Sequence, residues 1–110
     1  MAAPRKDVPQ GTLDLLILRL ILREPMHGYG VMQRLRLLTD DMFQVTPGSL
    51  FPALQRLEEN GWVVGCWNAS ENNRKAKYYE ITKSGRKQLD RAEDHWNAVT
   101  GAIARVLKEA

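Results

Sequence analysis

The last third of the chain carries apolar residues at the spacing of a seam between two helices. Thr82 is a suitable N-cap, and apolar residues follow it at alternating steps of three and four. These positions are Leu89, Ala92, Trp96, Val99, Ile103 and Val106. The repeat extends over about two and a half heptads, which is typical of a helix that packs along another helix. It predicts one long helix over residues 83–110 that joins two subunits.

A second apolar block lies near the start of the chain. Thr12 is a plausible N-cap for the run from Leu13 to Leu22. A helix here is apolar nearly all round and must be covered on more than one side. We therefore expect a homodimer held by the first and last helices, with Leu16 and Leu20 of the first helix at the interface.

Two shorter helices are predicted between these blocks. Pro25 ends the first helix, and residues 26–30 read as a tight connection. A second helix then carries apolar residues on one face at Val31, Leu35 and Leu38.

The third helix begins at Thr46-Pro47, an N-cap followed by proline at the first helical position. Its apolar stripe is Leu50, Ala53, Leu54 and Leu57, and its opposite side carries Gly48, Ser49, Pro52, Gln55, Arg56 and Glu59. Asn60-Gly61 is a suitable stop.

Strand-forming residues follow Gly61. Residues 62–67 and 76–81 are rich in β-branched and aromatic side chains around a polar tip, which predicts a β-hairpin. The expected fold is mainly α with a small β-hairpin: a winged helix-turn-helix with a long C-terminal dimerisation helix. The expected division is a flexible arm at 1–10, a winged-helix domain at 11–82 and a dimerisation helix at 83–110.

The positive charge is concentrated in the second half of the chain. The net charge of +3 lies entirely within residues 61–110, and residues 74–91 carry seven basic against two acidic residues. Such a cluster suits a polyanion such as DNA, although a solvated helix surface explains it equally well.

Composition excludes several other classes. With 44% hydrophobic and 26% charged residues, the chain has the composition of an ordinary globular domain. Its longest unbroken apolar run, 15–18, is far too short for a membrane span, and no signal peptide opens the chain, so we expect a cytoplasmic protein. A single cysteine, Cys66, excludes an internal disulfide, and we expect it to be a packed hydrophobe. With no catalytic constellation or metal-ligand cluster, we expect no enzyme, no cofactor and no metal.

Three stretches of the chain together resemble the PadR family of bacterial transcriptional regulators. They are His27-Gly28-Tyr29-Gly30; Val45-Thr46-Pro47-Gly48-Ser49-Leu50-Phe51-Pro52-Ala53-Leu54-Gln55-Arg56-Leu57-Glu58 with Gly61; and Arg74-Lys75-Ala76-Lys77-Tyr78-Tyr79-Glu80-Ile81-Thr82-Lys83-Ser84-Gly85. The resemblance covers residues 11–107 and implies a winged-helix homodimer, in most members a repressor. Phe51 stands where the family usually has tyrosine, so a phosphate contact by that hydroxyl is missing.

These observations give a set of candidate DNA contacts. They are Tyr29, Thr46, Ser49, Gln55 and Arg56 of the helices, and Arg74, Lys75 and Lys77 of the wing. Tyr29 resembles a family phosphate contact, and a buried connector tyrosine is an equal alternative for it. The expected partner is a palindromic operator in double-stranded DNA. The alternative is a winged-helix module that binds another protein and no DNA.

Trp96 has a second interpretation beside dimer core. Some multidrug-binding members of the family that this chain resembles stack aromatic compounds on a tryptophan of this helix. The resemblance thus implies a small aromatic effector at Trp96 that relieves repression.

Overall fold

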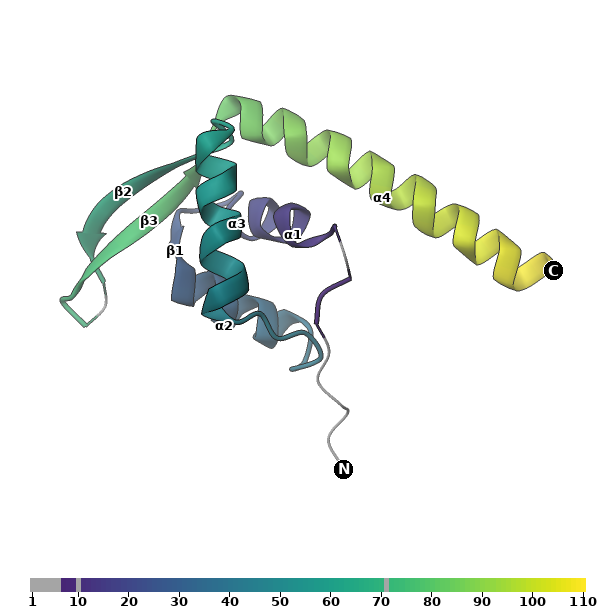
Figure 1. Ribbon diagram of the computed structural model, residues 1–110, viewed down its shortest axis with the longest axis horizontal. Helices are drawn as coiled ribbons and strands as arrows, with labels where there is room; N and C mark the ends of the chain where they lie inside the picture. Colours follow the sequence, from purple (N-terminus) through teal and green to yellow (C-terminus); the bar gives the residue numbers. More distant parts are fainter. Residues whose placement is uncertain (1–6, 10, 71) are drawn as a thin grey trace.

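The computed structural model describes residues 7–9, 11–70 and 72–110. Most of the predicted 1–10 arm, residues 1–6 and 10, lies outside them. The described elements are α1 (Leu13–Leu20), β1 (Met26–His27), α2 (Gly28–Leu38), α3 (Pro47–Glu59), β2 (Val63–Ala69), β3 (Lys75–Ile81) and α4 (Lys83–Glu109). The predicted winged helix with a long C-terminal helix is confirmed. In Figure 1 the β2–β3 hairpin projects to one side of the helical body and α4 extends to the other.

The segment predicted as a tight connection contains a short strand. Met26 and His27 pair with Tyr79 and Tyr78 of β3, so the sheet has three strands in the order β1-β3-β2. His27 also caps α2, because its Nδ1 accepts a hydrogen bond from the Gly30 amide at 3.0 Å. A two-residue strand has no periodicity, and its partners lie about fifty residues away, so the local pattern cannot predict it.

The core gathers one face of every helix around α1. Ile17, Leu18 and Ile21 are fully buried, and α1 packs against α2, α3 and α4. The rest of the core comprises Val31, Leu50, Ala53, Leu54, Leu57, Val63, Tyr79, Ile81 and Leu89. The predicted α3 stripe is therefore buried as expected. Cover on several sides also explains why the α1 sequence is apolar nearly all round.

Candidate nucleic-acid interface

The start of α3 is built by a side-chain cap. The Thr46 Oγ1 accepts a hydrogen bond from the Ser49 amide at 3.3 Å, and Pro47 occupies the first turn. The Thr46 hydroxyl also donates to the Ser49 Oγ at 3.3 Å. Both residues are exposed, so the two hydroxyls lie together at the helix N-terminus. A helix N-terminus with exposed hydroxyls suits a phosphate oxygen.

The polar side of α3 is exposed along its length, as predicted. Gln55 and Arg56 lie opposite the buried stripe. Arg56 is not a free cation, because its Nη2 lies 2.6 Å from the Asp14 Oδ1 of α1. This ion pair partly neutralises the guanidinium of Arg56. The sequence of the third helix alone could not predict it, because the partner lies in α1.

Tyr29 is presented at the N-terminus of α2. Its side chain is 64% exposed and lies edge-on to the Phe51 ring, with centroids 5.8 Å apart. Phe51 covers Gly28 so closely that a Cβ there would approach its ring to 2.6 Å. Phe51 therefore packs the α2–α3 junction, and the exposed hydroxyl at this place belongs to Tyr29.

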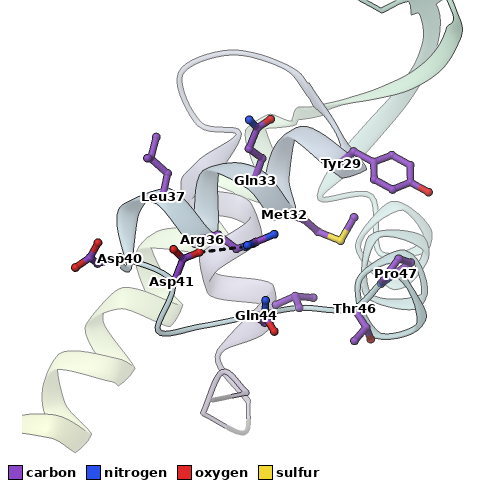
Figure 2. Close-up of a pocket in the computed structure, with 11 residues that line it drawn as sticks. Tyr29, Met32, Gln33, Arg36, Leu37, Asp40, Asp41, Gln44, Thr46 and Pro47 are labelled. Carbon is purple, nitrogen blue, oxygen red and sulfur yellow. Dashed lines mark hydrogen bonds and ion pairs between the residues drawn. The ribbon is translucent and has the colours of Figure 1, made fainter. Parts of the chain in front are cut away.

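A groove of about 780 Å³ lies beside α2 and the turn before α3, as Figure 2 shows. At one end are Tyr29 and Thr46, and at the other Asp40 and Asp41. Arg36 is paired with Asp41 at 3.3 Å, which leaves that end acidic. A polyanion is repelled by the acidic end, so only the Tyr29 end suits DNA.

The wing presents its cations unequally. Arg74 and Lys75 are exposed near the hairpin tip. The Lys77 Nζ instead lies 2.8 Å from the Glu58 Oε1 of α3, and its side chain is only 30% exposed. The hydrogen bond to Glu58 raises the pKa of Lys77 against the opposing effect of burial. Lys77 thus lies in the wing as predicted, but its ammonium group is paired with Glu58.

A second groove, of about 770 Å³, separates the wing from the helices. Tyr29 and Phe51 line it from the helices, and Trp67, Arg74, Lys75 and Lys77 line it from the wing. Sequence reasoning missed Trp67, which is 64% exposed. The strand alternation could have placed it, because Trp67 pairs with Lys77 and shares its face of the sheet. Thus Tyr29 and the three wing cations share this groove, whereas Gln55 and Arg56 lie outside it.

Cys66 occupies the other face of β2. It is exposed and pairs across the sheet with Tyr78. The expectation of a packed cysteine is therefore wrong, because this face of β2 is not covered by a helix.

The predicted dimer seam divides into a buried and an exposed part. Leu89 is 2% exposed within the core of its own chain, which corrects its placement at the subunit interface. Ala92, Leu16 and Leu20 are half-buried. Beyond them the exposed seam residues are Trp96, Val99, Ile103 and Val106, at 39%, 38%, 53% and 63%. This half of α4 projects from the body in Figure 1.

Neither a metal-ligand cluster nor a membrane-spanning helix is present among residues 7–9, 11–70 and 72–110. No group of three or more metal-ligating side chains is found there. None of the helices there is long and apolar enough to cross a membrane.

A helix-turn-helix with a polar second helix, followed by a basic wing, defines a winged-helix DNA-binding protein. Comparison with known proteins gives the same class. Residues 17–91 match the Transcriptional regulator PadR-like family. The chain belongs to this family and is a DNA-binding transcriptional regulator, not an enzyme.

Individual relatives agree over nearly the whole length. An uncharacterized protein X of Lysinibacillus sphaericus is 34% identical over 99 residues, which span 90% of this chain and 91% of that protein. A PadR-like transcriptional regulator of Bacillus cereus is 30% identical with a TM-score of 0.79, covering 92% of this chain and 96% of that one. A transcriptional regulator of Clostridium thermocellum is 28% identical with a TM-score of 0.82, covering 91% and 97%.

Proposed function

We propose that the protein is a homodimeric repressor that binds a palindromic operator through α3 and the wing. The observation that carries the proposal is the exposed polar face of α3 beside a basic wing in one protomer. Such a protomer reads one half-site, and a two-fold dimer therefore needs an inverted repeat. A DNA-binding regulator acts in the compartment that contains its DNA, which agrees with the cytoplasmic location expected from the sequence.

The exposed seam of α4 supports the dimer. Four apolar side chains lie along one face of a projecting helix, and each is more than one-third exposed. Continuous apolar surface of this kind marks an interaction site. A second copy of α4, with its own identical face, supplies a matching cover.

The proposed contacts follow from the placement of each side chain. Gln55 and Ser49 read base edges in the major groove, with Thr46 beside them at the helix start. Tyr29, Arg74 and Lys75 bind backbone phosphates on either side. Arg56 reaches a phosphate by leaving Asp14, at small cost because an exposed ion pair contributes about 0–1 kcal/mol.

The competing function is a winged helix that binds another protein. Such a module needs exposed apolar side chains on α3 and the wing. Trp67 and Val64 of the wing and Phe51 of α3 are exposed apolar residues. However, Arg74 and Lys75 at the wing tip and Gln55 on α3 are polar and exposed. These polar surfaces favour DNA.

Selection of bound sequences from random duplex DNA tests the proposal. We expect wild type to enrich an inverted repeat. Gln55→Ala should relax the preference at a few base pairs in each half-site, at about 1–3 kcal/mol per lost contact. Gln88→Ala, which removes the same side chain from α4, is the matched control and should select the wild-type sequence. Random sequences in the wild-type pool would refute base readout by α3.

We further propose that a planar aromatic compound binds at Trp96 and relieves repression. In a two-fold dimer the two copies of Trp96 approach one another, and tryptophan is bulky for a two-stranded seam. Each ring also borders a groove of about 540 Å³ between α1 and α4, lined among others by Leu15 and Ala92. A compound held between the rings gains about 0.5–1.5 kcal/mol per ring from stacking. It acts as an inducer if it favours a dimer whose recognition helices have the wrong spacing.

Titration with planar aromatic dyes, read by tryptophan fluorescence, tests this site. Wild type should be quenched strongly, and Trp96→Ala, which keeps Trp62 and Trp67, should not. Equal quenching in both proteins, or none in either, makes Trp96 a structural residue only.

A further inference from the structure

Glu58, in the last turn of α3, holds two groups of the wing at once. Its Oε1 accepts a hydrogen bond from the Lys77 Nζ at 2.8 Å, and its Oε2 accepts one from the Gly65 amide at 3.2 Å. The Glu58 and Lys77 side chains are 33% and 30% exposed, so both contacts are partly shielded from water. These contacts join α3 to both strands of the hairpin.

The position of Gly65 in the sheet explains the second contact. β2 is an edge strand, and hydrogen-bonded pairs alternate along an antiparallel ladder. The Thr82 amide donates to the Trp62 carbonyl, which makes that pair a hydrogen-bonded one. Gly65, three residues after Trp62, therefore points its amide away from β3. Glu58 supplies the acceptor that this edge lacks.

The contact between Lys77 and Glu58 depends in turn on the absence of a side chain at residue 65. A Cβ built there would collide with the Lys77 Cε and lie 2.9 Å from the Glu58 Oε2. Lys77 can therefore cross the edge strand to reach Glu58 only because residue 65 has no side chain. Gly65, Lys77 and Glu58 form one fitted unit, which we name the wing clamp.

We propose that the wing clamp fixes the angle between the wing and α3, so that Lys77 positions the DNA-binding surface and does not itself bind phosphate. This inference rests on the proposed DNA-binding function. Glu58 contacts β2 at Gly65 and β3 at Lys77, and both positions lie between the base of the hairpin at the core and its exposed tip. Among the described residues, these two hydrogen bonds are the ones that link strands β2 and β3 to α3, and the tip that carries Arg74 and Lys75 lies beyond them.

Charge and position make opposite predictions for Glu58. Removing an acidic residue beside a DNA-binding surface strengthens DNA binding if charge alone matters. Removing a positioning residue weakens it, because the wing must then be ordered when DNA binds. The sign of the change therefore separates the two roles.

The DNA-binding experiment compares Glu58→Ala with Glu59→Ala, the exposed neighbour that carries the same charge. Glu58→Ala should bind operator DNA about tenfold more weakly, in the range of couplings within one ion-pair network. Glu59→Ala should bind as well as wild type or slightly better. Tighter binding by Glu58→Ala overturns the clamp.

The salt dependence of binding separates Lys77 from Lys75. In the dimer, Lys75→Met should reduce the magnitude of the slope of log K against log salt by about two. Each lost phosphate contact changes this slope by about 0.9, and the dimer loses two contacts. Lys77→Met should weaken DNA binding without changing this slope. Adding Glu58→Ala to the Lys77→Met protein should lower the affinity for DNA little further. A flatter slope for Lys77→Met makes Lys77 a phosphate contact and overturns the inference.

Hydrogen exchange of the Gly65 amide, followed by NMR without DNA, tests the clamp independently. We expect Glu58→Ala to accelerate this exchange at least tenfold, while amides of the core strands keep their rates. Unchanged exchange overturns the clamp even if DNA binding falls. A protected amide in a wild-type protein that binds no DNA instead refutes the proposed function.

Discussion

Truncation after Arg91 should yield a monomer or an insoluble chain. The shortened protein keeps Leu89, which completes the core of the winged helix, and loses the exposed seam from Trp96 to Val106. Folding of the domain and assembly of the dimer are thereby separated. A monomer binds only one half-site of the operator. Its apparent operator affinity should therefore be at least a hundredfold lower than that of the dimer, which binds both half-sites together.

A point variant tests the same seam with the whole chain present. Ile103→Arg places a charge on the apolar face that is 53% exposed in the single chain. Asn97→Arg places the same charge away from the seam and is the matched control. Size-exclusion chromatography with light scattering should show a monomer for Ile103→Arg and a dimer for Asn97→Arg. A soluble, well-folded dimer of the chain truncated after Arg91 would contradict the role of α4.

The features that sequence predicted correctly are those that depend on near neighbours. Spacings of a few residues determine the apolar stripe of α3, its cap at Thr46 and the start of α4 after Thr82. Helical periodicity and capping act over that range. The order of helices and hairpin could therefore be predicted, and with it the winged-helix class.

The features that sequence missed depend on partners far along the chain. Arg56 meets Asp14 across 42 residues, and Lys77 meets Glu58 across 19. Each cation lies on the expected surface, but its partner comes from another element. Leu89 fits the heptad spacing equally well whether it faces the core or a second subunit, and only the packing of α4 on α1 decides between them.

DNA binding should be strongly dependent on salt. If each subunit neutralises about four phosphates, the slope of log K against log salt is about −7 in a dimer. Between 50 and 200 mM salt the affinity should then fall about ten-thousandfold. Lys75→Ala should weaken binding to all sequences alike and flatten this slope, since the exposed Lys75 has no acidic partner among the described ion pairs. Lys108→Ala, at the far end of α4, removes an equal charge away from the wing and is the control.

The most direct test of DNA binding by α3 and the wing is to measure affinity against salt concentration on two duplexes. One is the selected inverted repeat, and the other is a scrambled sequence of the same length. We expect both duplexes to show the steep salt dependence, with the inverted repeat bound more tightly at every salt concentration. Lys75→Ala should lower both affinities equally. Undetectable binding, or an affinity that does not change between low and moderate salt, would contradict the proposed function.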